Sequence, residues 1–476
     1  MEAISVFDML KIGVGPSSSH TLGPWRAAEQ FLEELETADL WGQIKHIKVE
    51  LYGSLALTGI GHGTDIAILM GLSGKDPVTV PVELVQELPK KISLEKRIYL
   101  KDQYAVPFDP IKDIEFRMSE MLPRHANGMR FEVYNDQGQG LYDGIFYSIG
   151  GGFVMKEEEK PMLGEKGIEL PYPINSGADL IAYCKGQQKV ASDIIFQNEL
   201  AWRNPEEVAA DLQTIWQVML KSIYRGCHTE GTLPGGLDVA RRAHNINKKL
   251  LGDQTYDNVD EWLDLLRKKS YHFSQIIKWI GCFAMAVNEE NANFGRIVTA
   301  PTNGASGVVP AVLMYYLLFE SPEAGEDEIN RFLMVSGEIG ALFKKGSTIS
   351  AAMGGCQAEI GVSSAMAAAA LCERLGGTVE QVLMAAEIAM EHHLGLTCDP
   401  VGGLVQIPCI ERNSMGAIKA ITAAKIAVES DPSKAKVSLD AVIKTMLETA
   451  QDMNLKYKET SQGGLAVNIA ISVPEC

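Results

Sequence analysis

The spacing of apolar residues separates a mixed first part of the chain from a helical remainder. Apolar and polar residues alternate over Ile47–Gly53, which is typical of a half-buried strand. Helical spacing runs over Trp25–Glu36 and again over Thr64–Leu72. Two further alternating runs flank an Asn-Asp-Gln-Gly turn within residues 130–149 and predict a hairpin. These elements predict an α/β domain over residues 1–154.

The character of the chain changes after this domain. Residues 155–175 are first charged and then interrupted by prolines, which is typical of a linker. Residues 176–476 are helical in pattern almost throughout. The expected helices are 178–187, 205–226, 236–251, 257–287, 307–319, 326–345, 357–375, 378–393, 413–429 and 437–452. The fold class that follows is an α+β N-terminal domain followed by a mostly all-α domain.

Composition limits the function classes. With 476 residues, of which 46% are hydrophobic, the chain can bury two or three full cores. Its net charge of −18 and the lack of any Lys/Arg-rich run disfavour nucleic-acid binding. The start of the sequence has no basic leader, and the most apolar run, Gly307–Phe319, is too short to cross a bilayer. We therefore expect a cytoplasmic enzyme without a membrane or nucleic-acid partner.

Three of the eight cysteines have unusual surroundings. Cys356, Cys398 and Cys409 follow one another at intervals of 42 and 11 residues and lie close to Gly or Pro. No Cys-x2-Cys pair of the kind that zinc sites use is present. Three separated thiolates that converge in the fold could hold a [4Fe–4S] cluster and leave one iron open as a Lewis acid. Three buried thiols without a metal fit the spacing equally well.

The last residue of the sequence is Cys476. A cysteine at this position is usually incidental. A cluster with three thiolate ligands, however, has one iron without a protein ligand. We hypothesise that the tail folds inward and that Cys476 caps this iron until substrate displaces it.

Loops rich in Gly, Pro, Ser and Asn carry further candidate chemistry. His20, His62 and His125 each lie in such a loop of the first domain, where catalytic residues concentrate, although a lone loop histidine is commonly only solvated. The loop at residues 300–307 precedes an apolar helix, and its N–H groups could bind a substrate carboxylate. An ordinary helix start explains that loop as well. Residues 344–350, which include Ser347, could supply similar donors.

Several segments together resemble the iron–sulfur bacterial L-serine dehydratases of the single-chain (type 2) kind. The matching motifs are Ile12–Thr21, Gly53–Ala56, Gly61–Asp65, Tyr147–Phe153, Pro301–Ala305, Cys398–Cys409 and Ser461–Asn468. The resemblance covers nearly the whole chain, and the Cys398–Cys409 segment is very specific. One departure is Ala351-Ala352-Met353, where the family usually has Gly-Ala-Glu, so that a carboxylate is missing near the cysteines.

The resemblance implies an L-serine ammonia-lyase that makes pyruvate and ammonia. It implies a [4Fe–4S] cluster on Cys356, Cys398 and Cys409 and no pyridoxal phosphate. It also implies a role in amino-acid degradation, such as supplying pyruvate for gluconeogenesis, and a homodimer. The first domain resembles an allosteric serine-binding domain, so L-serine is expected as substrate and as a candidate activator.

Dehydration of serine requires a base for the Cα proton and assistance for the departing hydroxyl group. We expect His62 and His125, and then His20, to be the acid, base or positioning groups. Which of the three removes the proton is left open by the sequence. The candidates for holding the substrate are Ser17, Thr64, Asn127, Ser148, Thr302, Asn303, Gly304, Ala305 and Ser347.

Two other readings remain open. One is a related lyase that acts on L-threonine or L-cysteine. The other is a cluster-based sensor without turnover, against which stand the acidic balance and the lack of a DNA-binding motif in the sequence.

Overall fold

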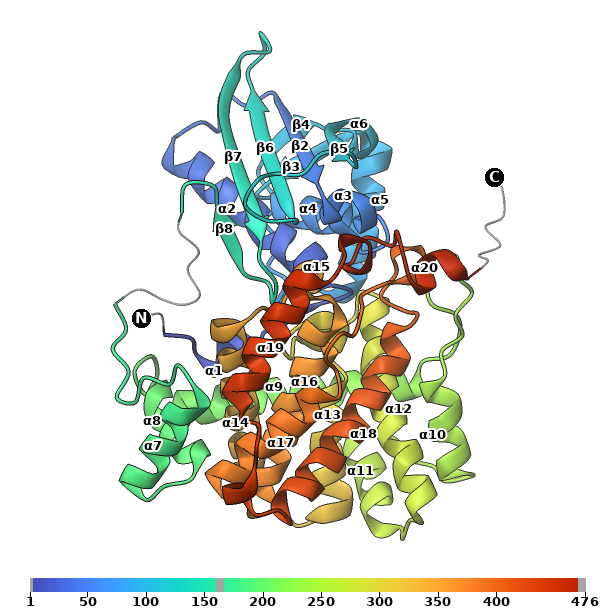
Figure 1. Cartoon of the computed structure of the whole chain (residues 1–476). Helices are drawn as coiled ribbons and strands as arrows, with labels where there is room; N and C mark the ends of the chain where they lie inside the picture. Colours follow the sequence, from blue (N-terminus) through green and yellow to red (C-terminus); the bar gives the residue numbers. More distant parts are fainter. Residues whose placement is uncertain (1–2, 160–166, 470–476) are drawn as a thin grey trace.

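The predicted succession of an α+β domain and a helical domain is confirmed. A computed structural model describes residues 3–159 and 167–469 of the chain. The sheet-containing domain sits above the helical domain, and the chain passes between them more than once (Figure 1).

The N-terminal domain is built on a five-stranded sheet. Its strand order is β5 (Ile114–Arg117), β2 (His46–Tyr52), β6 (Gly128–Tyr134), β7 (Gly140–Ser148) and β8 (Val154–Lys156). Only the β2–β5 pair is parallel, and the other neighbours are antiparallel. The expected hairpin is therefore the β6–β7 pair, and its strand β7 ends at Ser148.

One face of this sheet is closed by α2 (Gly23–Thr37), which packs against α4 (Thr64–Leu72). The side chain of Phe31 on α2 stacks on Phe131 with a centroid distance of 5.1 Å, and Phe146 meets Phe131 edge-on at 5.8 Å. Such aromatic contacts fix the helix on the sheet. The remaining elements of this domain are α3 (Ser54–Thr58), α5 (Val82–Glu95), α6 (Pro110–Asp113), β3 (Arg97–Leu100) and β4 (Tyr104–Pro107).

The helical domain surrounds one buried helix, α16 (Ile360–Arg374). Residues 360–373 are all buried, and alanines at many of these positions let the neighbouring helices approach closely. Those neighbours are α13 (Val308–Tyr315), α14 (Glu326–Gly346), α17 (Val379–Glu391) and α18 (Cys409–Val428). The outer helices are α7 (Gly177–Gln187), α8 (Ala191–Glu199), α9 (Pro205–His228), α10 (Ala243–Leu251), α11 (Val259–Lys268), α12 (Phe273–Ala292), α15 (Ala351–Gly354), α19 (Leu439–Asp452) and α20 (Leu465–Asn468).

Two of the predicted helices were wrong in extent. The expected helix 257–287 is broken between α11 and α12, where the backbone N–H of His272 and the Gln275 side chain form a new helix start. The expected helix 236–251 begins only at Ala243. Its first residues instead run back along the chain, with Ala240 in a β-bridge to Thr232. In both places a local capping or bridging hydrogen bond overrides the apolar period.

The first residues of the chain cross into the helical domain. Glu199 on α8 accepts hydrogen bonds from the Ser5 hydroxyl at 2.6 Å and the Val6 N–H at 2.9 Å, and so fixes α1 (Val6–Met9). The following strand β1 (Ile12–Val14) pairs antiparallel with β9 (Arg296–Val298), which follows α12. The loop that carries Ser17 and His20 is thereby held against the helical domain. Over the described ranges, no helix is long and apolar enough to cross a membrane.

Candidate active site

Three cysteines meet at the end of the helical domain that faces the sheet domain. Cys356 lies in a tight turn between α15 and α16, Cys398 lies in the loop after α17, and Cys409 is the first residue of α18. All three are buried. The Sγ atoms of Cys356 and Cys398 and a carboxylate oxygen of Glu359 lie within 4.8 Å of one another. Cys409 borders the same pocket as Cys398, so the three thiols lie in one region of the structure.

A small pocket opens beside these thiols, and we call it the thiol pocket. Its walls come from both domains and from segments far apart in the sequence. They are formed by Pro16, Ser17, His62, Gly304, Glu359, Cys398, Pro400, Val405, Cys409 and Glu459. Any molecule in this pocket would touch cysteine, histidine and carboxylate groups together.

The charges around the thiols suit a metal cluster. A hydrogen bond from Cys398 lowers the pKa of Cys356 below its ordinary value, and the nearby Arg412 guanidinium acts in the same direction. The pKa values of Cys398 and Cys409 are raised, the first by its contact with Cys356 and by burial, the second by burial. Buried thiols that resist ionisation alone become thiolates once a metal supplies positive charge. The donor set therefore fits an iron–sulfur cluster.

Arg412 was not foreseen from the sequence. Its guanidinium is held by the Thr397 carbonyl at 2.6 Å and by the Asp399 carboxylate at 3.0 Å. It lies on α18 one turn after Cys409, just before the start of the helix that was expected over 413–429. Its fixed positive charge offsets part of the negative charge that thiolates would bring into this buried region.

His62 presents one ring nitrogen to the thiol pocket. Its Nδ1 lies 2.9 Å from the Thr58 carbonyl, which can only accept, so the proton sits on Nδ1 and the Nε2 lone pair is free. That Nε2 is 3.5 Å from the Glu459 carboxylate. Burial lowers the pKa of His62 to about 4, so the ring is neutral at pH 7. A neutral imidazole with a free lone pair can take up a proton.

His20 lies against His62, with a ring centroid distance of 4.6 Å. The Ser54 hydroxyl donates to the Glu459 carbonyl at 2.7 Å, so at 3.1 Å it must accept from His20 Nε2–H. The other nitrogen, Nδ1, is 2.9 Å from Ser19 Oγ and 3.5 Å from the Glu459 carboxylate. Burial, and then the neighbouring His62, hold the pKa of His20 well below its usual range.

Glu459 contacts both histidines and the Cys398 backbone, and the sequence did not predict this role. Its backbone N–H donates to the Cys398 carbonyl at 2.9 Å, and its carboxylate lies between His20 and His62. Burial, together with the charges of Glu359 and Cys356, raises its pKa well above the ordinary value. Burial also raises the pKa of Glu359 to about 7. The only signal for Glu459 in the sequence was its place just before the Ser461–Asn468 motif.

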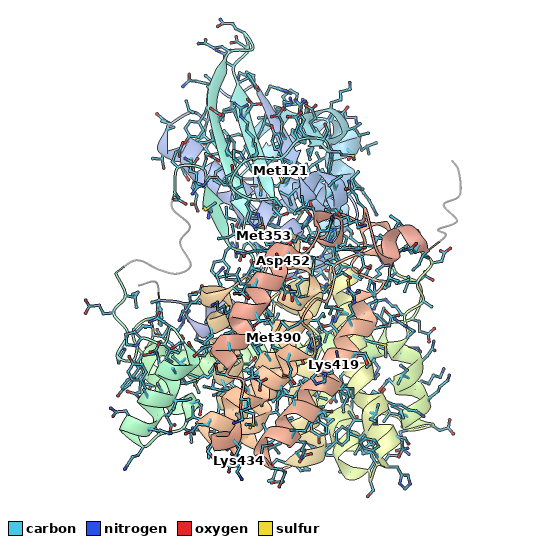
Figure 2. The ribbon with its side chains drawn as sticks, in the orientation of Figure 1. Met121, Met353, Met390, Lys419, Lys434 and Asp452 are labelled. Atoms are coloured by element: carbon cyan, nitrogen blue, oxygen red, sulfur yellow. The ribbon has the colours of Figure 1, made fainter. Side chains whose placement is uncertain are left out.

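His125 occupies a neighbouring cavity rather than the walls of the thiol pocket. That cavity also contains Ser347 and three cationic residues, Arg124, Lys344 and Lys458, and no carboxylate borders it among the described residues. Met353, the residue that stands in place of a family glutamate, is partly exposed there, at the junction of the two domains (Figure 2). Burial lowers the pKa of His125 to about 4.

The other expected substrate ligands divide into two groups. Asn127 and Ser148 adjoin His125, and their Oδ1 and Oγ atoms are buried without a hydrogen-bond partner in the described part of the chain. By contrast, the Ser17 hydroxyl accepts from the His20 N–H at 3.1 Å, and the Thr64 hydroxyl donates to the His20 carbonyl at 2.6 Å. Ser17 and Thr64 therefore stabilise the backbone around His20, although Ser17 also borders the thiol pocket.

The loop over Thr302, Asn303, Gly304 and Ala305 is buried and lies between the two domains. The Asn303 side chain donates to the Val14 carbonyl at 2.9 Å, while its Oδ1 atom has no partner among the described residues. A Cβ on Gly304 would lie 3.2 Å from the Glu359 carboxylate. The loop therefore brings backbone groups close to Glu359 and the cysteines. Cys476 lies outside the described residues.

Comparison with known proteins agrees with this geometry. A family model described as serine dehydratase beta chain matches residues 5–159, and one described as serine dehydratase alpha chain matches residues 185–466. The L-serine dehydratase of Streptomyces coelicolor is 49% identical over 471 residues, 98% of this chain and 99% of its own. The L-serine dehydratase 1 of Escherichia coli is 46% identical over 467 residues, and that of Helicobacter pylori 45% over 471, each with the same coverage.

Proposed function

Because the chain belongs to the single-chain bacterial L-serine dehydratases, we propose that the thiol pocket is where it converts L-serine to pyruvate and ammonia. The chain is a lyase that acts on serine without pyridoxal phosphate. Loss of water from serine gives aminoacrylate, which tautomerises and hydrolyses to the products. The observation that carries the proposal is that His62, Glu459 and Cys398 share one pocket.

We assign Cys356, Cys398 and Cys409 as the ligands of a [4Fe–4S] cluster. When bound through three thiolates, such a cluster supplies a Lewis-acidic iron that withdraws charge from the hydroxyl and carboxylate of serine. The positive charge of Arg412 lowers the energetic cost of burying negatively charged thiolates in this site.

His62 is our candidate for the base that takes the Cα proton. The Thr58 carbonyl fixes its tautomer, and burial keeps the ring neutral, so its Nε2 can accept a proton at pH 7. His20, fixed by Ser54, supports the ring of His62 and does not itself border the pocket.

Glu459 is our candidate for the acid. Burial raises the pKa of its carboxyl group well above the ordinary value and so favours the protonated form, which can assist a departing hydroxide. His125, Asn127 and Ser148 are proposed to hold the carboxylate and ammonium of serine, and the 302–305 loop, of which Gly304 borders the thiol pocket, is proposed to add backbone donors.

The deciding experiment is anaerobic purification with iron and sulfide analysis, an absorption spectrum, and a pyruvate assay on L-serine. L-Threonine and L-cysteine serve as competing substrates. The Cys398→Ser variant should lose iron, whereas Cys372→Ser, a buried thiol within α16, should keep it. Full iron content in Cys398→Ser would refute the assignment of the ligands.

Three further parts complete the proposal. Cys476 would cap the iron that has no other protein thiolate until substrate displaces it, so the substrate-free spectrum of Cys476→Ser should differ from that of the parent protein. The enzyme is a cytoplasmic homodimer, which sedimentation and cell fractionation test. L-Serine also activates through the N-terminal domain, which would appear as a sigmoidal rate curve.

A further inference from the structure

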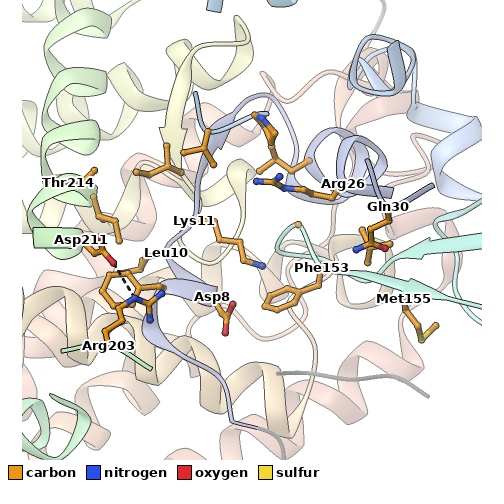
Figure 3. Close-up of a pocket in the computed structure, with 18 of the residues that line it drawn as sticks. Asp8, Leu10, Lys11, Arg26, Gln30, Phe153, Met155, Arg203, Asp211 and Thr214 are labelled. Carbon is orange, nitrogen blue, oxygen red and sulfur yellow. Dashed lines mark hydrogen bonds and ion pairs between the residues drawn. The ribbon is translucent and has the colours of Figure 1, made fainter. Parts of the chain in front are cut away.

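Another cavity lies away from the thiol pocket, where the two domains meet. Its volume is about 750 Å³, within the range of small-molecule sites. The walls come from the α1–β1 segment, α2, the end of the sheet and α9 (Figure 3). Nothing in the dehydration chemistry uses this cavity.

Lys11 projects into the middle of the cavity. Its backbone is fixed, since its N–H donates to Thr299 Oγ1 at 3.0 Å and its carbonyl accepts from the Thr299 N–H at 2.8 Å. The ammonium lies 3.3 Å from the centroid of the Phe153 ring (Figure 3). Among residues 3–159 and 167–469, no carboxylate forms an ion pair with it.

The two arginines of the cavity are already paired with carboxylates. Arg26 pairs with Glu29 at 2.7 Å, and Arg203 pairs with Asp211 at 3.1 Å, as the dashed line in Figure 3 marks. Asp8 and Glu159, which also border the cavity, each accept a backbone hydrogen bond, from the Ser5 N–H at 3.1 Å and the Lys156 N–H at 3.2 Å. Lys11 is therefore the cation of the cavity that lacks an ion pair among the described residues, and a single carboxylate could pair with it.

Much of the remaining wall is apolar, and Gln30, Thr214 and Glu159 also border it. The apolar residues include Phe7, Leu10, Ile12, Leu22, Phe153 and Ile215. A phosphate or a dicarboxylate would leave negative charge unpaired against these side chains. A monocarboxylate with an apolar body would satisfy both the lysine and the walls.

We propose that this cavity binds a monocarboxylate that carries an apolar body, with its carboxylate on Lys11 and its body against Phe153 and the aliphatic wall. Both free amino acids and organic acids have this chemistry. Burial lowers the pKa of Lys11 to about 8, because it disfavours the charged ammonium. A bound carboxylate would favour the charged form again.

Phe153 connects this cavity to the residues proposed to bind serine. Phe153 closes a turn in which its N–H donates to the Gly150 carbonyl at 3.0 Å, and this turn follows Ser148 directly. A second ammonium, that of Lys344, lies 3.6 Å from the Phe153 centroid and borders the His125 cavity. A carboxylate that draws Lys11 away from Phe153 therefore acts on the turn next to Ser148, and we expect it to change KM for L-serine.

The test is calorimetric titration of the holoenzyme with 3-phenylpropionate, L-phenylalanine and uncharged 3-phenylpropan-1-ol. The enzyme can dehydrate none of these probes to pyruvate, so binding is measured apart from the proposed function. We expect the carboxylate to bind and the alcohol to bind at least tenfold more weakly. Tighter binding of L-phenylalanine than of 3-phenylpropionate would identify an amino acid as the ligand, and the reverse an organic acid.

Variants and labelling complete the test. Lys11→Met should weaken 3-phenylpropionate binding at least tenfold, Lys11→Arg should restore it, and Lys112→Met, at an exposed lysine, should have no effect. In the unmodified protein, 3-phenylpropionate should slow acetylation of Lys11 but not of Lys112, a result that does not depend on any variant folding. Equal binding of acid and alcohol, unchanged binding in Lys11→Met, or no protection of Lys11 would overturn the proposal.

Discussion

Replacing Ser148 by alanine separates substrate binding from stability. The Ser148 side chain is fully buried at the end of β7, and its Oγ has no hydrogen-bond partner among the described residues. A buried hydroxyl group without a partner costs about 1–3 kcal/mol. Removing it offsets the packing lost with the oxygen, so we expect the free energy of unfolding to change by less than ~1 kcal/mol.

The effect on substrate binding should be much larger. If Ser148 Oγ donates to the serine carboxylate, its loss removes a hydrogen bond to a charged group, which contributes about 1.5–3 kcal/mol. KM for L-serine should then rise by roughly 10–150-fold, since 1.4 kcal/mol corresponds to a factor of ten. Initial rates of pyruvate formation and urea unfolding, both under anaerobic conditions, measure the two quantities.

Ser364 provides the matched control. It is equally buried, in α16, but its hydroxyl donates to the Gly416 carbonyl at 2.9 Å. Ser364→Ala should therefore lower stability by ~1 kcal/mol and leave KM unchanged. An unchanged KM in Ser148→Ala, combined with a loss of stability like that of Ser364→Ala, would show that Ser148 is a structural residue and refute the reasoning.

Three other predictions address the base, a buried carboxyl group and a helix contact. His62→Gln should lower kcat by ~10²–10⁴ with the iron content unchanged; loss of iron would assign the residue to the cluster instead. Burial raises the pKa of Glu199 from 4.5 to about 7 in the folded state, so its stabilising contribution is complete below pH ~4.5 and falls, by roughly 3 kcal/mol, as the pH rises through 7. Glu199→Gln should abolish this decline in urea unfolding measured at pH 5 and pH 8, and parallel pH curves for the two proteins would argue against it. A Cβ on Gly226 would lie 2.2 Å from the Ala286 carbonyl oxygen, so Gly226→Ala should lower Tm through a cost of ~1–3 kcal/mol; Gly186→Ala, where a Cβ meets nothing within 4 Å, should not.

Much of the fold could be predicted from the apolar period because long helices such as α2 and α9 bury one face over several turns. The helix over Thr64–Leu72 has the predicted bounds, since its first turn and its apolar run coincide. Strands β1 and β9 could not be predicted. Each has three residues, and their partners are almost 300 residues apart, so neither carries a local signal.

The candidate site divides in the same way. His62 and the cysteines could be singled out because glycine and proline loops around them are poor places for core residues. Glu459 and Arg412 look like ordinary charged surface residues in the sequence. Only the tertiary fold buries Glu459 and partly buries Arg412 near the thiols, and no pattern of neighbouring residues encodes that burial.

The pairing of β1 with β9 also bears on how the protein is made. During synthesis β1 emerges first and has to wait for Val298 before its partner strand is complete. At ~5–20 residues per second, this delay lasts roughly 15–60 s. The sheet can form in that interval, but the loop with Ser17 and His20 has nothing to dock on. The nascent chain therefore keeps His20 apart from Cys356, Cys398 and Cys409 until most of the helical domain has left the ribosome.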